Sequence, residues 1–333
     1  MSEQPSNPMP APLPAGKVVG GYRIVEKIAS GGFGIVYRAV SPEGQEVALK
    51  EFLPAALAHR EHGEGPVLVP RQNRALYRIG MRSFFEEGRA LAQIVHPSVV
   101  SVLNFFLEND AVYLVMNYLQ GASLQQFIQT AASLKHAKIL RESTIRSLFD
   151  EILRGLRVVH QHKLLHLDIK PGNILITDDD RAVLIDFGAA RNVLHKGSNY
   201  LQPMFTPGFS APEMYSRDEA IGPWCDIYAV GACIFSCMKG VPPPDASDPH
   251  TLSKLVDLLA DRQGLYSDSL IELVLACMHP DPSQRPHSVF SVQKMLFQAP
   301  RETGTSGGSG GERSVQTTQF LSDSRRASSR LWS

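Results

Sequence analysis

The residues best suited to chemistry lie close together near the middle of the chain. Asp168, Lys170 and Asn173 share one short stretch, and Asp186 follows after what reads as a pair of strands. An acid, a cation and an amide on one loop, with a second acid nearby, can orient a hydroxyl, neutralise a phosphate and hold Mg²⁺ through oxygen ligands. Phosphoryl transfer depends on such groups, because its catalysis is mostly positioning and charge stabilisation. The spacing therefore predicts phosphoryl transfer.

The surrounding sequence predicts two groups of elements to position these residues. In the first third, alternating apolar residues predict five strands, at residues 22–28, 35–40, 46–50, 99–106 and 111–116. Helical periodicity in the same region covers residues 84–95. After Gly121 the pattern is helical, with helices expected at residues 141–160, 226–238, 250–259, 267–278 and 287–297.

Composition narrows the class of protein. The chain has 333 residues, of which 43% are hydrophobic and 20% charged, with a formal net charge of +0. This is typical of a globular protein, and it gives no sign of nucleic acid or an anionic membrane as a partner. No apolar run approaches the roughly 20 residues that span a bilayer, and the first residues lack the apolar core of a signal peptide. We therefore expect a cytoplasmic location.

Composition also sets the domain boundaries that we expect. Residues 1–20 hold too few apolar side chains to offset the entropy of ordering, which predicts a disordered leader. Residues 299–333 are rich in Gly and Ser and predict a flexible tail. The folded part should span residues 21–298.

The cysteines and a group of histidines suggest metal or redox chemistry, but the structural interpretation is favoured. Cys233 and Cys237 lie four residues apart in an apolar helical pattern and read as buried small hydrophobes, as do Cys225 and Cys277. His160, His162 and His166 fall at a helix end and at the start of the Asp168 loop, so we do not assign them to a metal.

The residues around Asp168 and Asp186 resemble the catalytic and magnesium loops of eukaryotic-type (Hanks-type) serine/threonine protein kinases, in a form similar to a bacterial subgroup. Residues 29–36 resemble the family's glycine-rich loop, residues 47–50 its ATP-lysine strand and residues 211–213 the end of its activation segment. The resemblance implies an α+β, bilobal protein kinase fold. The N-lobe (21–119) would hold a small five-stranded antiparallel sheet with one main helix, and the C-lobe (120–298) would be larger and mainly helical.

The resemblance also implies the catalytic roles. Asp168 would orient and deprotonate the substrate hydroxyl, and Lys170 would neutralise the γ-phosphate. Asn173 and Asp186 would hold Mg²⁺. Lys50 would contact the ATP α- and β-phosphates.

Two further sets of residues follow from the resemblance. Glu87 would hold Lys50, because it stands at the family's distance before His96-Pro97. Ala29 replaces the first glycine of the usual glycine-rich loop. Together with Lys50, the ATP-binding residues would be Ile28, Ala29, Ser30, Gly31, Gly32, Phe33, Gly34, Val36, Ala48, Met116, Asn117, Leu119 and Leu175.

Several residues match architectural positions of the family. Asp226 would brace the catalytic loop, and Glu213 and Arg285 would form a buried ion pair. A stack that links the lobes in active members would be formed by Leu91, Val102, His166 and Phe187.

The chain departs from the family pattern in two places. Leu167 stands where many members have arginine, and residues 54–82 are extra sequence. In a helix, four of the arginines in this insertion would share one face: Arg71, Arg74, Arg78 and Arg82. That face is either solvated, the simpler interpretation, or a docking site for an acidic or phosphorylated partner.

The sequence thus predicts an ATP- and Mg²⁺-dependent kinase that phosphorylates Ser or Thr of protein substrates and autophosphorylates in a signalling role. Thr317, Thr318 and Ser328 of the tail are candidate autophosphorylation sites that would bind a phosphopeptide-binding partner; the alternative is an inert linker. The alternative functions are a pseudokinase-like ATP-binding scaffold and a small-molecule kinase of related fold. We expect no nucleic-acid partner and no membrane span.

Overall fold

The structure, a computed structural model, describes residues 10–61, 63, 65–133, 140–187, 205–216 and 218–297. The described residues form two compact units. The first, here called the sheet unit, holds the described residues up to His96 and from Val100 to Leu119. The second, the helical unit, holds Pro97–Val99 and the described residues from Gln120 onward.

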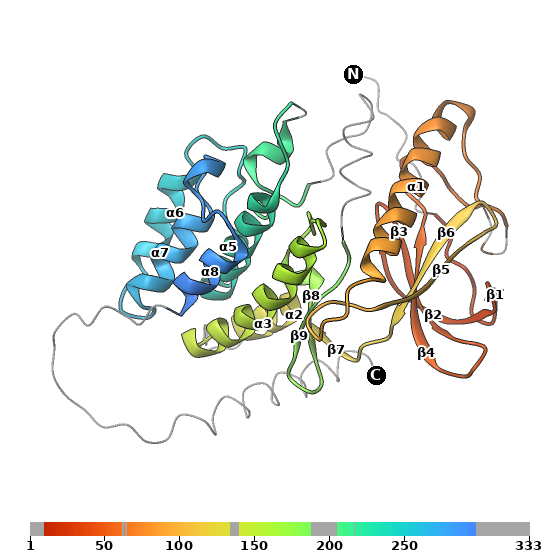
Figure 1. Ribbon diagram of the computed structural model, residues 1–333, viewed down its shortest axis with the longest axis horizontal. Coiled ribbons are helices and arrows are strands. Elements are labelled where there is room, and N and C mark those ends of the chain that lie inside the picture. The colour runs from red at the N-terminus through yellow and green to blue at the C-terminus, as the bar shows by residue number, and fades with distance from the viewer. Residues whose placement is uncertain are drawn as a thin grey trace. The chain divides into compact units, whose positions relative to one another are not determined.

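The sheet unit is built on an antiparallel sheet with the strand order β1-β2-β3-β4-β6-β5 (Figure 1). Its strands are β1 (Val18–Val19), β2 (Tyr22–Gly31), β3 (Gly34–Val40), β4 (Glu46–Phe52), β5 (Val102–Glu108) and β6 (Ala111–Asn117). The five predicted strands are all present, and the short β1 is an addition at the edge. The expected sheet-rich N-lobe and helical C-lobe are confirmed.

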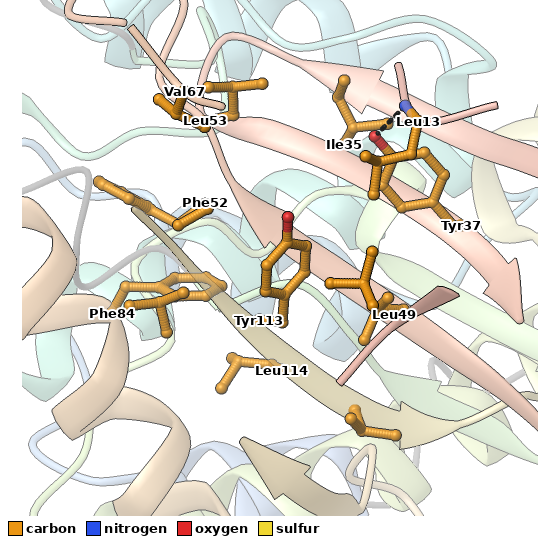
Figure 2. Close-up of a cluster of buried hydrophobic side chains, with 14 of the residues drawn as sticks. Leu13, Ile35, Tyr37, Leu49, Phe52, Leu53, Val67, Phe84, Tyr113 and Leu114 are labelled. Carbon is orange, nitrogen blue, oxygen red and sulfur yellow. Dashed lines mark hydrogen bonds between the residues drawn. The ribbon is translucent and has the colours of Figure 1, made fainter. Parts of the chain in front are cut away.

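Both faces of the sheet are covered near its centre. On one face Tyr37 of β3 pairs in register with Leu49 of β4, and Leu49 pairs with Val115 of β6; all three side chains are buried. Figure 2 shows Leu13, from before β1, beside Tyr37 on this face. The opposite face carries Lys50 and Phe52, and Phe52 packs against Phe84 of α1 with ring centroids 5.3 Å apart. A sheet covered on both sides needs apolar residues on both sides.

The region predicted to be a disordered leader is ordered from residue 10. Val18 and Val19 pair with β2, and Leu13 and Val19 are 5% and 0% exposed. The prediction failed because it counted apolar residues locally. Leu13 and Val19 are buried against side chains far along the chain, and this burial offsets the entropy of ordering.

The helix of the sheet unit begins ten residues earlier than predicted. A short 3₁₀ turn, η1 (Arg71–Asn73), leads into α1 (Arg74–Leu91). The buried residues of α1 are Tyr77, Gly80, Phe84, Glu87, Gly88 and Leu91. The arginines at 71, 74, 78 and 82 are exposed, as expected for one face of a helix.

The helical unit contains a small antiparallel sheet with the strand order β7-β8-β9 and a set of helices (Figure 1). The strands are β7 (Gly121–Ser123), β8 (Ile174–Thr177) and β9 (Ala182–Leu184). The α-helices are α2 (Leu124–Ser133), α3 (Glu142–Gln161), α5 (Pro223–Lys239), α6 (Thr251–Ala260), α7 (Asp268–Cys277) and α8 (Val289–Leu296). The short 3₁₀ turns are η2 (Pro171–Asn173), η3 (Pro212–Tyr215) and η4 (Pro282–Gln284).

The central helix of this unit is α5, which is buried on all sides over most of its length. It starts with Pro223 and ends at Lys239. Gly240 follows with a φ of 76°, the left-handed conformation that glycine adopts readily after a helix. All four cysteines are free and buried. Burial raises the pKa of the Cys277 thiol to about 12, so this sulfur stays protonated at neutral pH. Among the described helices, none is both long and apolar enough to cross a membrane.

Candidate active site

One carboxylate of α5 fixes the main chain of the loop that carries Asp168. Asp226 is fully buried, and its two oxygens accept hydrogen bonds from the main-chain N–H groups of His166 and Leu167, at 2.9 and 2.8 Å. His160 Nε2, at the end of α3, lies 2.8 Å from the same carboxylate. The predicted brace is therefore present. It also supports Leu167 in a left-handed conformation (φ 60°), which is unusual for a leucine.

His166 connects the two loops of the site. Its Nε2 lies 3.1 Å from the carbonyl of Ile185, and its Nδ1 accepts from the N–H of Asp168 at 3.3 Å. This arrangement requires the neutral ring with its proton on Nε2. Burial lowers the pKa of His166, which favours the neutral form, although the nearby Asp226 opposes this shift. The ring stacks on Phe187 with centroids 4.3 Å apart, so half of the predicted stack lies within this unit.

The Asp168 carboxylate is fixed by three side chains. Oδ2 accepts from Asn173 Nδ2 at 2.7 Å and lies 3.0 Å from Lys170 Nζ. Oδ1 accepts from Thr206 Oγ1 at 3.2 Å, and Lys170 Nζ also donates to Thr206 at 3.3 Å. Thr206 thus belongs to the cluster, because its hydroxyl contacts both Asp168 and Lys170. The result is a carboxylate of defined orientation beside one cation.

Asn173 joins the catalytic loop to the segment that carries Asp186. Besides the Asp168 side chain, its Nδ2 contacts the carbonyls of Asp168 and Asp186, at 2.9 and 3.4 Å. Asn173 O accepts from Ile185 N at 3.0 Å. All these side-chain bonds use the amide nitrogen, so the amide oxygen is the atom that a cation would contact. An amide oxygen and a carboxylate are ligands that Mg²⁺ prefers, usually alongside phosphate oxygens and water, so the pair fits that ion.

The predicted buried ion pair lies in the same unit. Arg285 donates to both oxygens of Glu213, at 2.7 and 2.9 Å, and both side chains are at most 1% exposed. The remaining guanidinium bonds go to the carbonyls of Trp224, His279 and Pro280. This pair, with its further bonds to main-chain carbonyls, fixes η3 to the segment before α8. Its role is structural.

The glycine-rich stretch forms the tight hairpin between β2 and β3. Gly31 pairs with Gly34, so Gly32 and Phe33 make the turn. Their carbonyls accept from Ala55 N and Leu53 N, each at 3.0 Å, and Phe33 packs partly buried against the hydrophobic core. Ile28, Ala29, Ser30 and Gly31 are exposed along β2. The hairpin tip is thus attached to the chain that follows β4.

Three of the residues predicted to contact the adenine lie on the same face of the sheet as Lys50. Val36 pairs with Lys50, and Ala48 pairs with Met116, which places these four side chains on one side. Asn117 ends β6, and Leu119 follows it as the last residue of the sheet unit. Leu175, by contrast, belongs to β8 of the helical unit and is half-buried there.

Lys50 and Glu87 are both buried, with exposures of 9% and 4%. Lys50 Nζ lies 5.3 Å from the centre of the Phe84 ring. Phe84 and Glu87 are both buried residues of α1, about one helical turn apart. A methyl group at the neighbouring Gly88 would overlap the Leu114 side chain, so glycine permits α1 to approach β6 closely. The helix thus presents Glu87 toward the face that carries Lys50.

Comparison with known proteins places these features in a family. A model of the protein kinase domain matches residues 22–297. The chain belongs to the protein kinase family. The human serine/threonine-protein kinase Nek10 is 28% identical over 86% of this chain, and serine/threonine-protein kinase D1044.8 of Caenorhabditis elegans is 30% identical over 80%. The chain spans about a quarter of the length of these curated relatives, 23% and 26%.

Solved protein kinase structures resemble this one. The PpkA-294 apo form is 31% identical, with a TM-score of 0.72, over 87% of this chain and 100% of that one. The Mycobacterium tuberculosis PknI kinase domain is 23% identical, with a TM-score of 0.63, over 85% and 98% of the two chains, and shows the same fold. The chain therefore carries a Hanks-type serine/threonine protein kinase domain. Such domains take ATP as phosphoryl donor, use Mg²⁺ and act on proteins.

One group of buried polar residues in this kinase domain was not foreseen from the sequence. Glu51, directly after Lys50, forms a buried ion pair with Arg60 of the insertion. A glutamate in a strand normally reads as exposed, and the arginine that satisfies it lies in a segment with no regular pattern. The only available signal was Glu51 itself, a charge at a position where alternation with Val47 and Leu49 predicts burial.

Proposed function

We propose that the chain is an active serine/threonine protein kinase that transfers the γ-phosphoryl group of ATP to protein hydroxyls. The observation that carries the proposal is the fixed Asp168 carboxylate, held by Lys170, Asn173 and Thr206 at 2.7 to 3.2 Å. A base that orients a hydroxyl needs such a defined position, since correct placement supplies much of the rate enhancement.

In this proposal Asp168 accepts the proton of the substrate hydroxyl as the hydroxyl oxygen attacks the γ-phosphorus. The bond between that phosphorus and the β–γ bridging oxygen breaks, and ADP leaves with the bridging oxygen. Lys170 Nζ, 3.0 Å from Asp168, neutralises charge on the transferred group. Thr206 bonds to both side chains and shapes the place where the hydroxyl-bearing residue lies. When bound, Mg²⁺ supplies positive charge at the phosphates. Asn173 and Asp186 would hold that ion through their side-chain oxygens.

The sheet unit contributes the residues that bind ATP. Lys50 contacts the α- and β-phosphates and Glu87 orients it. The N–H groups of the glycine-rich turn approach the phosphates without side-chain obstruction. Val36, Ala48 and Met116 of this unit contact the adenine, and the main chain of Asn117 to Leu119 bonds its edge.

The test uses the full chain with Mg²⁺, radiolabelled ATP and a basic protein acceptor. We expect phosphate on serine or threonine of the acceptor. In Asp168→Asn the rate of transfer should be lower by about a hundredfold or more. Mapping the modified residues by mass spectrometry identifies their type. Nucleotide binding without transfer to any protein would make the chain a pseudokinase scaffold and contradict the proposal.

We further propose that the tail is an autophosphorylation substrate, with Thr317, Thr318 or Ser328 as acceptor. These residues lie outside the described part of the chain. Ser328 follows Arg325-Arg326-Ala327, and a tethered substrate is presented at high effective concentration. The phosphorylated tail would bind a phosphopeptide-binding partner. Prolonged incubation with Mg²⁺ and ATP that leaves the tail unmodified by mass would contradict this.

We also propose a cytoplasmic location. Four free, buried cysteines are compatible with a reducing compartment, where thiols persist. Fractionation of cells that express a tagged chain tests the location.

A further inference from the structure

A buried carboxylate lies directly beside the ATP lysine in sequence, on the opposite face of β4. Glu51 is 0% exposed and accepts hydrogen bonds from Tyr113 at 2.7 Å and from Tyr37 at 2.9 Å. It also pairs with the guanidinium of Arg60, which is 3% exposed. Burial and the adjacent Glu51 charge raise the pKa of both tyrosines, so their hydroxyls remain donors.

Arg60 and Tyr37 extend this cluster to the leader. Arg60 Nη1 donates to the carbonyl of Ala11 at 3.1 Å, and Arg60 Nε donates to the carbonyl of Gly65 at 3.0 Å. The hydroxyl of Tyr37 accepts from Leu13 N at 3.0 Å, the bond drawn as a dashed line in Figure 2. The ion pair thus joins three separate segments: β4, the leader and the insertion.

Arg60 ends a short segment that reaches the glycine-rich turn. Near its start, Leu53 N and Ala55 N donate to the carbonyls of Phe33 and Gly32, each at 3.0 Å. Between them lies Pro54, whose carbonyl accepts from Leu57 N and Ala58 N at 2.8 and 2.9 Å and closes one compact turn. The segment is therefore fixed at one end by the Glu51–Arg60 pair and attached at the other to the two turn residues.

The hairpin also contacts β4 directly. Gly34 pairs with Phe52, and a methyl group at Gly34 would overlap the carbonyl of Glu51. The backbone of Glu51 therefore supports the end of the hairpin while its side chain holds Arg60. A buried ion pair contributes little net stability after desolvation. The effect of the Glu51–Arg60 pair is instead to hold residues 53–60 in one conformation.

We propose that Glu51 and Arg60, completed by leader residues 11–13, are positioning residues for the glycine-rich turn and so set the affinity for ATP. This inference rests on the proposed function, in which the turn binds phosphates. A turn held in one conformation binds phosphate without first being ordered, and loss of that order weakens binding. The Asp168 cluster is not touched by these contacts, so the chemical step at saturating ATP should be preserved.

The test compares Glu51→Gln/Arg60→Met with the wild-type full chain. The double substitution removes both charges and leaves side chains of similar size, so no buried charge is left alone. Arg71→Met is the matched control, since Arg71 is exposed on η1. We expect KM for ATP and Kd for a fluorescent ATP analogue to rise on the order of tenfold, with kcat within about twofold. The control should change neither constant.

Tyr37→Phe is a milder second variant, because it removes one hydroxyl that contacts both Glu51 and Leu13. It should raise Kd for the analogue in the same direction by a smaller factor. Hydrogen exchange at residues 31–36 should accelerate in both variants and not in Arg71→Met. This readout tests the positioning role even if the wild-type chain shows no phosphoryl transfer, so failure of the two proposals is distinguishable.

Three results would overturn the inference. A lower melting temperature with unchanged Kd, KM and exchange at the turn would show that the cluster only stabilises the fold. A fall in kcat with unchanged KM would place its effect on the chemical step. Equal effects of Arg71→Met would show that the response is not specific to the buried pair.

Discussion

Asn173 Nδ2 lies 2.7 Å from Asp168 Oδ2 and 2.9 Å from the main-chain oxygen of Asp168. The amide proposed to hold Mg²⁺ therefore also fixes the carboxylate proposed to orient the substrate hydroxyl. The Asn173 side chain would thus bind Mg²⁺ through its oxygen and fix Asp168 through its nitrogen. This arrangement makes the effect of losing Asn173 predictable.

In Asn173→Ala we expect turnover to fall by about 10²- to 10⁴-fold, the usual range for a lost acid–base contribution. Raising the Mg²⁺ concentration should restore only part of the rate. Excess ion compensates for a weak ligand set, but it does not replace the hydrogen bond to Asp168. The measurement is kcat as a function of Mg²⁺. Full recovery at high Mg²⁺ would show that the bond to Asp168 contributes nothing to the rate.

Asp168→Asn separates chemistry from binding. We expect kcat to fall by about 10²- to 10⁴-fold while the Kd of an ATP analogue stays nearly unchanged, because the lost interaction belongs to the transition state. Lys50→Met should lower kcat and also raise the Kd of the analogue, since it removes a charge that contacts ATP in the ground state as well as in the transition state. Turnover and analogue titration on the same preparations check this. Ordinary turnover by Asp168→Asn would remove that residue from the mechanism.

The buried pair of Glu213 and Arg285 should affect folding more than chemistry. Arg285→Met leaves the Glu213 charge buried and unpaired, and we expect the free energy of unfolding to fall by about 3–5 kcal/mol. Arg285→Met combined with Glu213→Gln removes that charge, so the double variant should be more stable than Arg285→Met alone. Denaturant unfolding measures both. A double variant that is less stable than the single one would contradict this account.

Some features were predictable from the sequence because they depend on local patterns or on spacing. Alternation located β3 and β4, and the motif order located Asp226, whose bonds to His166 and Leu167 are present as expected. The Glu213–Arg285 pair was found in the same way. In each case the residue type, its neighbours and its position along the chain carried the information.

Other features depend on contacts between distant segments, which no local pattern shows. The leader was expected to be disordered, yet Leu13 is buried beside Tyr37. Arg60 lies nine positions after Glu51 in a segment without helical or strand periodicity, so their pairing was not foreseen. The start of α1 at Arg74 was missed because its first turns mix an exposed Ile79 with a buried Tyr77, which obscures the helical period.

The stability of the protein should depend on pH through His166. Burial lowers the pKa of this histidine below its ordinary 6.5. As the pH falls through that value, the unfolded chain binds a proton that the folded chain does not, so the free energy of unfolding falls. The slope from one such group is at most about 1.4 kcal/mol per pH unit, and it ends below the folded pKa.

Denaturant unfolding between pH 7.5 and 5 checks this prediction, with His166→Phe compared with wild type. Phe can still stack on Phe187, and the loss of stability below pH 6.5 should be smaller in this variant. His162→Phe is the matched control, because it makes the same substitution at an exposed histidine. An identical profile for His166→Phe and wild type would show that His166 does not contribute.

The last prediction concerns control of activity and starts from Leu167. In family members with arginine at this position, the guanidinium helps to bind a phosphate on the activation loop, a charge-assisted contact that orders the loop. Leucine cannot make that contact. Here the loop around Leu167 is instead fixed by Asp226, which accepts from Leu167 N at 2.8 Å, and by the bonds of Thr206 to Asp168 and Lys170. We therefore expect basal activity without phosphate on the activation segment.

Ser198 and Tyr200 of that segment lie outside the described residues, and Thr206 is occupied in the Asp168 cluster. The experiment treats the purified full chain with phosphatase, confirms by mass that it is unmodified, and measures the initial rate on an exogenous substrate. The rate should be linear from the start and equal in Ser198→Ala, because no phosphate has to be added before Asp168 and Lys170 are in place. A lag that shortens as enzyme concentration rises would instead reveal activation by phosphorylation between molecules. A rate that collapses in Ser198→Ala would identify that residue as the switch.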